Sequence, residues 1–238
     1  MKIIKNLENH KGSRVYGRRH GKALKPKSME RFQEYFPKYS ITLPVNKTLD
    51  PKTLFTHHPE EIWLEIGFGK GEHLAWQAST HLEVGMIGCE PFMNGVSGLV
   101  DHIVSENLSN IRFFMDDARL LIDALPDASI ARAFILFPDP WPKTKHHKRR
   151  VINEGNLKQL SRVLKNHAEL RIATDHHDYR RWIIATLSEN KDFKWKSDHP
   201  DDWHKRGHDW PSTRYEIKAL KEGRKSAYLT YIRRAGLE

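Results

Sequence analysis

From residue 61 onward, short apolar runs alternate with stretches of helical periodicity, and this alternation limits the folds open to the chain. The apolar runs lie at residues 62–66, 84–89, 111–115, 131–137 and 169–173. The helical stretches lie at residues 72–80, 94–107, 118–124, 151–165 and 179–189. Strands that alternate with helices pair in parallel through right-handed crossovers. The sequence therefore predicts an α/β fold with a doubly wound, mostly parallel sheet, to which residues 225–233 add an antiparallel edge strand.

Positive charge dominates the chain and is densest near its beginning. The 238 residues carry a formal net charge of +10. One acid-free stretch holds Lys11, Arg14, Arg18, Arg19, His20, Lys22, Lys25 and Lys27. We expect residues 1–40 to form a flexible basic arm with a short helix at residues 28–35, and residues 41–238 to form the folded domain. Because a basic surface attracts polyanions, nucleic acid is the first expected partner and an anionic membrane the second.

Several classes of protein are disfavoured by the sequence. No apolar run approaches the roughly 20 residues that a membrane helix needs, and the opening MKIIKNLENHKG has no apolar core typical of a secretory signal. Cys89 is the only cysteine, and we expect it to be a buried apolar residue. The histidine pairs at residues 146–147 and 176–177 lack the spacing of a metal site. We therefore expect a cytoplasmic protein without a structural metal and without a membrane association.

A glycine-rich turn follows the first predicted strand and opens a helix. Gly67, Gly69 and Gly71 come directly after Glu65 and Ile66. Glycines let the backbone turn sharply and let a ligand approach without meeting a Cβ atom. The spacing differs from the dinucleotide pattern GxGxxG, because the third glycine comes one residue early. The carboxylate of Glu65 would repel a pyrophosphate but could pair with the ammonium group of an amino acid.

Acidic residues also end the next two predicted strands. Glu90 follows the second strand, where a carboxylate accepts hydrogen bonds from ribose hydroxyls. Asp117 follows the third strand and could meet an adenine amino group. A ligand with an ammonium group, a ribose and an adenine but no phosphate is S-adenosyl-L-methionine rather than a dinucleotide. The sequence thus favours S-adenosyl-L-methionine as the cofactor.

A proline-rich segment, FPDPWPK, ends the strand at residues 131–137. Alternate prolines fix φ and hold the preceding residues extended, so Asp139 and Trp141 should project from a stiff loop. Trp141 could stack on an extruded base while Asp139 bonds its edge. A cationic run follows at once, consisting of Lys143, Lys145, His146, His147, Lys148, Arg149 and Arg150. Such a run is often only a solvated face, but beside this loop we expect it to contact phosphates.

Two further segments have interpretations that the residues alone leave open. Asp175 follows the strand at residues 169–173 and should lie at the same edge of the sheet. Residues 213–216, consisting of Thr213, Arg214, Tyr215 and Glu216, either contact substrate or begin a helix that Thr213 caps.

These motifs together resemble the bacterial tRNA (guanine-N7-)-methyltransferase family. The likeness runs from residues 14–19 (RVYGRR) to residues 213–216 (TRYE), and FPDPWPK with the trailing HHKRR is its most specific part. Lys145 and Pro142 depart from the common arginine and histidine, but they leave the charge and the stiff loop in place. The resemblance implies a Rossmann-like class I methyltransferase that forms N7-methylguanosine at position 46, in the variable loop of tRNA, without an obligatory protein partner.

The resemblance also implies roles for individual residues. Asp139 would be catalytic and would line the methyl-donor site with Glu65, Glu90, Asp117 and the three glycines. Lys143, Asp175 and residues 213–216 would contact the substrate, and residues 145–150 would contact RNA. Two alternatives stay open, namely a methyltransferase for another RNA base and a non-catalytic RNA-binding module. Nucleoside analysis separates the first from the expected activity, and donor-dependent thermal stabilisation separates the second.

Overall fold

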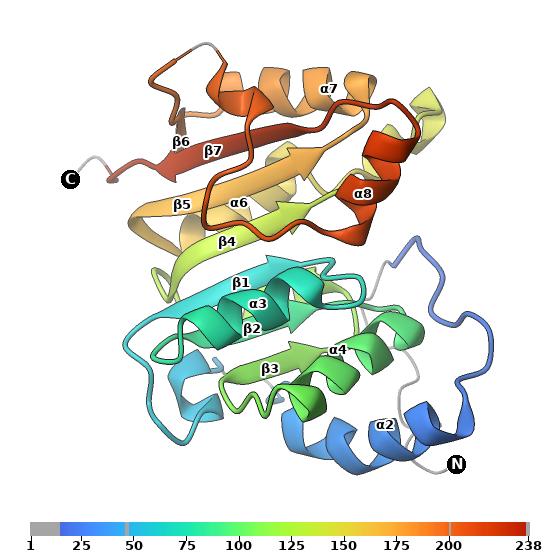
Figure 1. Ribbon diagram of the computed structural model, residues 1–238. Helices are drawn as coiled ribbons and strands as arrows, with labels where there is room; N and C mark the ends of the chain where they lie inside the picture. The colour runs from blue at the N-terminus through green and yellow to red at the C-terminus, as the bar shows by residue number, and fades with distance from the viewer. Residues whose placement is uncertain (1–14, 46–47, 200, 237–238) are drawn as a thin grey trace. The chain divides into compact units, whose positions relative to one another are not determined.

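The computed structural model describes residues 15–45, 48–199 and 201–236. The chain divides into two compact units, Met1–Leu125 and Pro126–Glu238, and each is considered by itself (Figure 1). Lys11 and Arg14 of the expected arm lie outside the described residues. The expected arm boundary at residue 40 stays a prediction, and the helix α2 (Pro26–Tyr39) already precedes it.

The first unit is built on three parallel strands in the order β3-β2-β1. They are β1 (Ile62–Ile66), β2 (Gly85–Cys89) and β3 (Ile111–Phe114). Ile66 pairs with Cys89, and Cys89 with Phe114, so the carboxyl ends of the three strands are level. Residues that follow these strands are therefore brought to one edge of the sheet.

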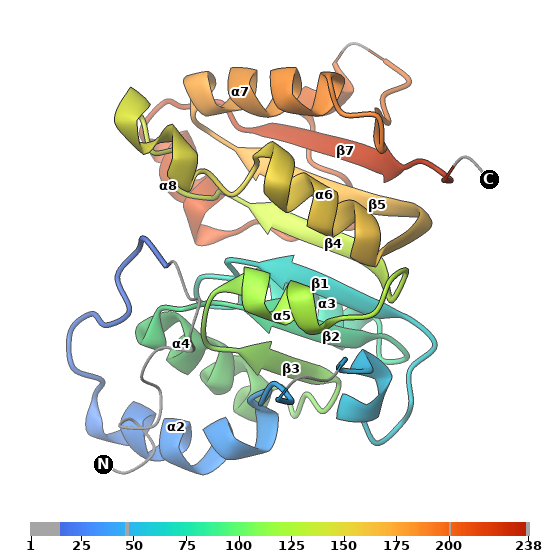
Figure 2. The ribbon, with the colours of Figure 1, turned by 180° about the vertical axis from the view of Figure 1, so that it is seen from behind.

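Helices cover both faces of this sheet. The helices α3 (Glu72–Thr80) and α4 (Met93–Ser105) lie on one face, and α5 (Ala118–Ala124) lies on the other (Figures 1 and 2). In α4, residues Val96, Leu99, Val100 and Ile103 recur at helical spacing and are all almost fully buried. This apolar stripe explains why the segment folds as a helix packed on the sheet.

Two smaller elements complete the first unit. The helix α2 packs against α4 and β3, with Phe32 and Phe36 buried. It is longer than the helix expected at residues 28–35, because Pro26 is well suited to the first turn. The short 3-10 helix η1 (Pro51–Leu54) is capped by Asp50, whose carboxylate accepts from the backbone N–H of Lys52 at 3.0 Å.

The second unit holds four strands in the order β4-β5-β7-β6. The strands β4 (Ile130–Leu136) and β5 (Leu164–Thr174) are parallel, whereas β7 (Ala227–Arg233) is antiparallel to both β5 and β6 (Phe193–Trp195). The antiparallel direction expected for the last strand is confirmed. Its expected edge position is wrong, because β6 pairs along its outer side. A strand of three residues gives too little periodicity to be predicted.

The helices of the second unit differ in their bounds from the expected ones. The helix α6 (Glu154–Val163) begins three residues late, because the side chain of Asn153 accepts from the N–H of Asn156 at 3.0 Å and caps it. The helix α7 (His177–Ser188) is capped by His176. Both lie on one face of the sheet (Figure 2).

The other face of this unit carries a long connection. It contains the 3-10 helix η3 (Asp202–His204) and leads to α8 (Arg214–Lys221) (Figure 1). The cationic run forms a further 3-10 helix, η2 (Thr144–Arg149). None of the helices in the described parts of the chain combines the length and the apolar character that crossing a bilayer requires.

Candidate functional site

The turn after β1 has the strained backbone that its glycines were expected to permit. Gly67, Gly69 and Gly71 have φ values of 77°, 59° and 83°, all in the left-handed region. An added Cβ atom on Gly67 would meet nothing within 4 Å, so the space over its backbone is open. At Gly71 the same atom would lie 2.8 Å from Cβ of Leu99 on α4. The turn is thus open on one side and pressed against α4 on the other.

Glu90 ties this turn to the end of β2. Its Oε2 accepts from the backbone N–H of Gly69 at 2.9 Å, and its Oε1 accepts from that of Phe92 at 3.0 Å. A carboxylate oxygen has lone pairs for more than one donor. Glu90 therefore accepts from two backbone N–H groups at once and joins the turn to the start of α4.

Asp117 and Asp116 mark the end of β3. Asp117 is buried and caps α5, since its Oδ1 accepts from the N–H of Arg119 at 3.1 Å. The hydrogen bond to Asp117 raises the pKa of the Arg119 guanidinium. Asp116 accepts from Nη2 of Arg19 at 2.6 Å, and the carbonyl of Arg19 accepts from the N–H of Met93 at 2.9 Å. Part of the basic segment is thus fastened beside the predicted adenine contact.

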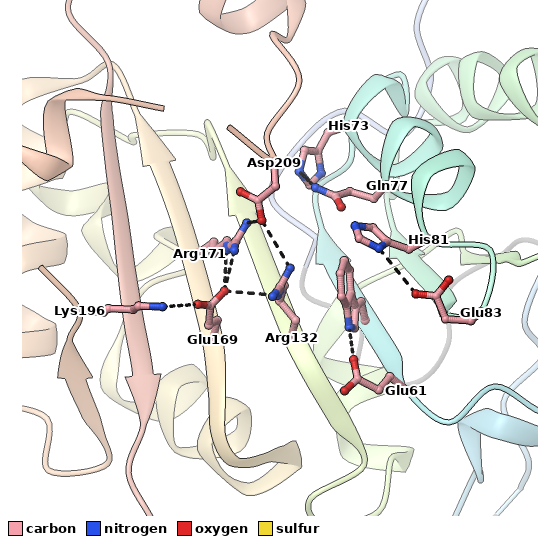
Figure 3. A network of polar contacts seen from close by, with 11 residues as sticks. Glu61, His73, Gln77, His81, Glu83, Arg132, Glu169, Arg171, Lys196 and Asp209 are labelled. Carbon is pink, nitrogen blue, oxygen red and sulfur yellow. Dashed lines mark hydrogen bonds and ion pairs between the residues drawn. The ribbon is translucent and has the colours of Figure 1, made fainter. Parts of the chain in front are cut away.

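Glu65 is paired with a histidine of the following helix. Its side chain is buried, and Oε2 lies 2.8 Å from Nδ1 of His73 on α3. Nε2 of His73 lies 3.2 Å from Nε2 of Gln77 (Figure 3). His73 was not among the residues singled out in the sequence. The expected pairing of Glu65 with an ammonium group stays a prediction, and what the structure shows is a carboxylate that fixes the start of α3 to β1.

The loop after β4 has a strained and anchored backbone. Phe137 and Trp141 have positive φ values of 51° and 43°, which cost energy in residues other than glycine. The N–H of Phe137 donates to the carbonyl of Ala173 at 2.7 Å. Between these positions Asp139 is exposed, yet partial loss of hydration raises the pKa of its carboxyl group. The loop therefore presents a carboxylate that is easier to protonate than an ordinary aspartate.

The side chains of the cationic run differ in how far they are exposed to solvent. Lys143, Lys145 and Lys148 are exposed, and His146, His147 and Arg149 are partly exposed. The guanidinium of Arg149 lies 4.9 Å from the ring centroid of Trp141. Arg150 differs from the rest, because its side chain is only 1% exposed and is bonded within the protein. The expected contact of Arg150 with RNA therefore needs correction, since its burial leaves no exposed guanidinium for a phosphate.

The remaining predicted residues meet at the same end of the second unit. Asp175 follows β5 and pairs with Arg224 at 2.8 Å. Thr213 caps α8 by accepting from the N–H of Glu216 at 3.3 Å, so the capping interpretation holds. Arg214 and Tyr215 are exposed in the first turn of that helix. The strand β7 follows α8 and begins with Ala227, which pairs with Thr174 at the end of β5.

Glu216 is held by two residues that the sequence did not single out. The hydroxyl of Tyr228 donates to Oε1 of Glu216 at 2.5 Å, and Nη1 of Arg206 donates to Oε2 at 2.9 Å. Burial of the phenol and its hydrogen bond to Glu216 raise the pKa of Tyr228. The carboxylate thus fastens α8 to β7 and to the long connection. A direct contact of Glu216 with substrate stays a prediction.

An ionic network fixes the long connection against the sheet. Glu169 on β5 pairs with Arg171 at 2.7 Å and with Lys196 at 2.9 Å, and Arg171 pairs with Asp209 at 2.7 Å (Figure 3). Burial tends to raise the pKa of Glu169, but the hydrogen bond from Lys196 and the charge of Arg171 lower it overall. The network lies beside a hollow of about 200 Å³ walled by Trp195, Trp203 and Trp210.

The predicted residues therefore gather in two places. Glu65, the three glycines, Glu90 and Asp117 lie at the carboxyl edge of the first unit. Asp139, the cationic run, Asp175 and residues 213–216 belong to the second unit. That the two groups form one pocket stays a prediction. Within residues 15–45, 48–199 and 201–236, no group of three or more histidine, cysteine or acidic side chains is placed to hold a metal ion.

Comparisons with known proteins point to one kind of enzyme. A protein-family profile described as "Putative methyltransferase" matches residues 59–229. A tRNA (guanine-N(7)-)-methyltransferase of Rhodospirillum rubrum is 43% identical over 227 residues, which cover 93% of this chain and 88% of that protein. A protein of the same name from Ruegeria sp. (strain TM1040) is 44% identical over 224 residues, covering 92% and 87%.

Solved structures of other methyltransferases share the fold. The 16S rRNA methyltransferase KamB matches with a TM-score of 0.53 at 12% identity, covering 83% of this chain and 99% of that one. An antibiotic-related methyltransferase matches with a TM-score of 0.52 at 19% identity, covering 82% and 97%. At such identities the likeness concerns the fold alone, and it confirms the expected Rossmann-like class I methyltransferase fold.

The packing of α4 against the glycine turn can be tested by one methyl group. In Gly95→Ala the new Cβ would lie 2.3 Å from the carbonyl oxygen of Gly69, so the turn must shift. We expect at least a tenfold loss of affinity for S-adenosyl-L-methionine in isothermal titration. The control is Gly155→Ala in α6, where the nearest atom lies at 3.5 Å and alanine favours the helix by about 0.5–1 kcal/mol. Equal affinities in the two variants would contradict a donor site at this turn.

Proposed function

Since the chain belongs to the tRNA (guanine-N(7)-)-methyltransferase family, we propose that it transfers a methyl group from S-adenosyl-L-methionine to N7 of guanine 46 in the variable loop of tRNA. The observation that carries the proposal is the loop after β4. It holds an exposed carboxylate, Asp139, on an anchored backbone and runs directly into the cationic helix η2. A fixed carboxylate beside a cationic surface suits a reaction on a base within a polyanion.

The edge of the first unit fits the methyl donor. The space over Gly67 is open, and the N-cap residue of α3 is Gly71, which has no side chain to cap the helix. We assign the carboxylate of Glu90 to the ribose hydroxyls and that of Asp117 to the adenine amino group, since each follows a strand that ends at this edge. Bound there, S-adenosyl-L-methionine would supply an electrophilic methyl group on a sulfonium centre.

The reaction at guanine N7 makes modest chemical demands. N7 carries an in-plane lone pair and no proton, so no base is needed before the new bond forms. Positive charge develops on the purine as the methyl group is transferred, and a fixed carboxylate stabilises it. We assign this role to Asp139, which would also accept from the amino group of the guanine. Catalysis then depends on in-line placement and on charge.

The RNA would be held by the second unit. Lys143, Lys145 and Lys148 expose their ammonium groups on and beside η2, and Arg149 lies over Trp141. Each cation that meets a phosphate releases counterions, so binding should weaken as salt rises. Arg214 and Tyr215 are exposed in the first turn of α8, and we assign them to the substrate together with the partly exposed Asp175.

The position of methylation tests the proposal directly. We expect an unmodified tRNA transcript incubated with labelled S-adenosyl-L-methionine to yield N7-methylguanosine in nucleoside analysis. A transcript with adenine at position 46 should yield none, while it still competes for binding. Methylation of the second transcript at the level of the first would place the reaction elsewhere. A different methylated nucleoside would favour an enzyme for another base.

Replacement of Asp139 by a neutral residue of the same shape tests whether its negative charge contributes to catalysis. Asp139→Asn should lower turnover by about 10²–10³-fold, because the stabilising charge is lost while the shape is kept. The dissociation constant for tRNA should change little. In the unaltered protein the raised pKa of Asp139 means that the carboxylate is present above that pKa and is lost as the pH falls through it. The acidic limb of kcat/KM should therefore lie above the usual range of an aspartate.

The same variant supplies the control for the pH dependence. In Asp139→Asn the residual activity should show no such acidic limb, with folding at each pH followed by circular dichroism. Near-normal turnover in this variant would remove Asp139 from the mechanism.

A further inference from the structure

Arg150 is the last cation of the run after the Asp139 loop, and its surroundings differ from those of its neighbours. Its side chain is 1% exposed. Nε donates to the carbonyl of Pro140 at 2.9 Å, and Nη2 donates to Oδ2 of Asp178 at 2.6 Å. The guanidinium carbon lies 4.9 Å from the ring centroid of Tyr179 and 5.0 Å from that of Trp182. The side chain is thus held by hydrogen bonds and by two aromatic rings.

The chain next to Arg150 is also hydrogen-bonded to α7. The hydroxyl of Tyr179 accepts from the N–H of Ile152 at 3.3 Å, and Nε1 of Trp182 donates to the carbonyl of Ile152 at 2.7 Å. Tyr179 is fully buried, and burial raises the pKa of its phenol to about 12, so it stays a neutral donor and acceptor. The segment after η2 is therefore tied to α7 through both backbone groups of Ile152.

Pro140 follows Asp139 directly, and the carbonyl of Pro140 accepts the hydrogen bond that joins the loop to Arg150. The entry to the loop is held by the hydrogen bond from Phe137 to Ala173. Asp139 therefore sits between two backbone anchors, one on β5 and one reaching α7 through Arg150 and Asp178. Prolines on either side limit the φ freedom between these anchors. The direction of the Asp139 carboxylate depends on both.

We propose that Arg150 is a positioning residue for methyl transfer, which sets the orientation of Asp139 by holding the Pro140 carbonyl and is itself held by Asp178. This role rests on the proposed function of Asp139. It separates Arg150 from the cations before it, which face the solvent and are assigned to RNA. Two adjacent arginines then have different tasks, because Arg149 is partly exposed over Trp141 whereas Arg150 is enclosed.

Only arginine fits this place. Its planar guanidinium can donate from Nε to a carbonyl and from Nη2 to a carboxylate while it stays close to two aromatic rings. A lysine keeps the charge but has a single ammonium group, which cannot span both acceptors in the same geometry. Arg150→Lys therefore removes the anchor on Pro140 without removing the positive charge. A displacement of the reacting groups by about 1 Å can cost about 10²-fold in rate.

The experiment compares Arg150→Lys and Asp178→Asn with the double variant Lys145→Gln/Lys148→Gln. We would measure kcat, the KM for tRNA, and the dissociation constant for tRNA between low and moderate salt. Arg150→Lys should lower kcat by about 10–100-fold and leave the salt slope of binding unchanged. Asp178→Asn should lower kcat by a smaller factor in the same way. The double lysine variant should weaken binding and reduce the salt slope by up to about 2.

Asp178→Asn guards against a variant that fails to fold. The side chain of Asp178 is 59% exposed, so the substitution should keep the native fold, which circular dichroism and titration with S-adenosyl-L-methionine would verify. A reduced salt slope in Arg150→Lys would overturn the proposal by making Arg150 a phosphate contact. Unchanged kcat in folded Arg150→Lys and Asp178→Asn would also overturn it. Absence of N7-methylguanosine with the unaltered protein would instead overturn the proposed function.

Discussion

The first unit depends on the carboxylate of Glu90 at the edge that we propose binds the methyl donor, which we call the donor edge. It accepts from the N–H of Gly69 in the turn after β1 and from the N–H of Phe92 before α4. Two backbone segments from successive strands are thereby joined by one side chain with charge-assisted hydrogen bonds, which are stronger than neutral ones. Without this link Gly69 would lose its side-chain acceptor, and the turn would be held by the hydrogen bond from the N–H of Gly67 to the carbonyl of Cys89 and by its packing against α4. The backbone that borders the open space at Gly67 would then be less firmly fixed.

In the second unit a positively charged side chain, rather than a carboxylate, fixes the backbone of a loop. There a buried guanidinium, that of Arg150, holds the carbonyl of Pro140, whereas at the donor edge an acid holds N–H groups. Each choice follows from the backbone group that the loop leaves unpaired, since N–H groups need an acceptor and carbonyls need a donor. A loop held in this way keeps a strained backbone, as at Phe137 and Trp141. The strain is tolerated because the surroundings fix both ends.

Local signals in the sequence predicted most of the strands, the glycine turn and the stiff proline loop, because periodicity, glycine and proline act over a few residues. What was missed depends on contacts distant in the chain. Arg150 looked like its cationic neighbours, and only its contacts with residues of α7 reveal that it is enclosed. The contact of Glu65 with His73 on α3 was also not predicted. The strand β6 was too short to be predicted, which is why β7 was expected at the edge.

Titration calorimetry with S-adenosyl-L-methionine on the unaltered protein and on Glu90→Ala tests the central claim most directly. The account predicts that the substitution weakens donor binding by about 10–100-fold, as expected when a charged acceptor of one or two hydrogen bonds is lost. Glu106→Ala, at the far end of α4, should bind the donor like the unaltered protein. Equal affinity in Glu90→Ala and in the unaltered protein would contradict the assignment of this edge to the donor.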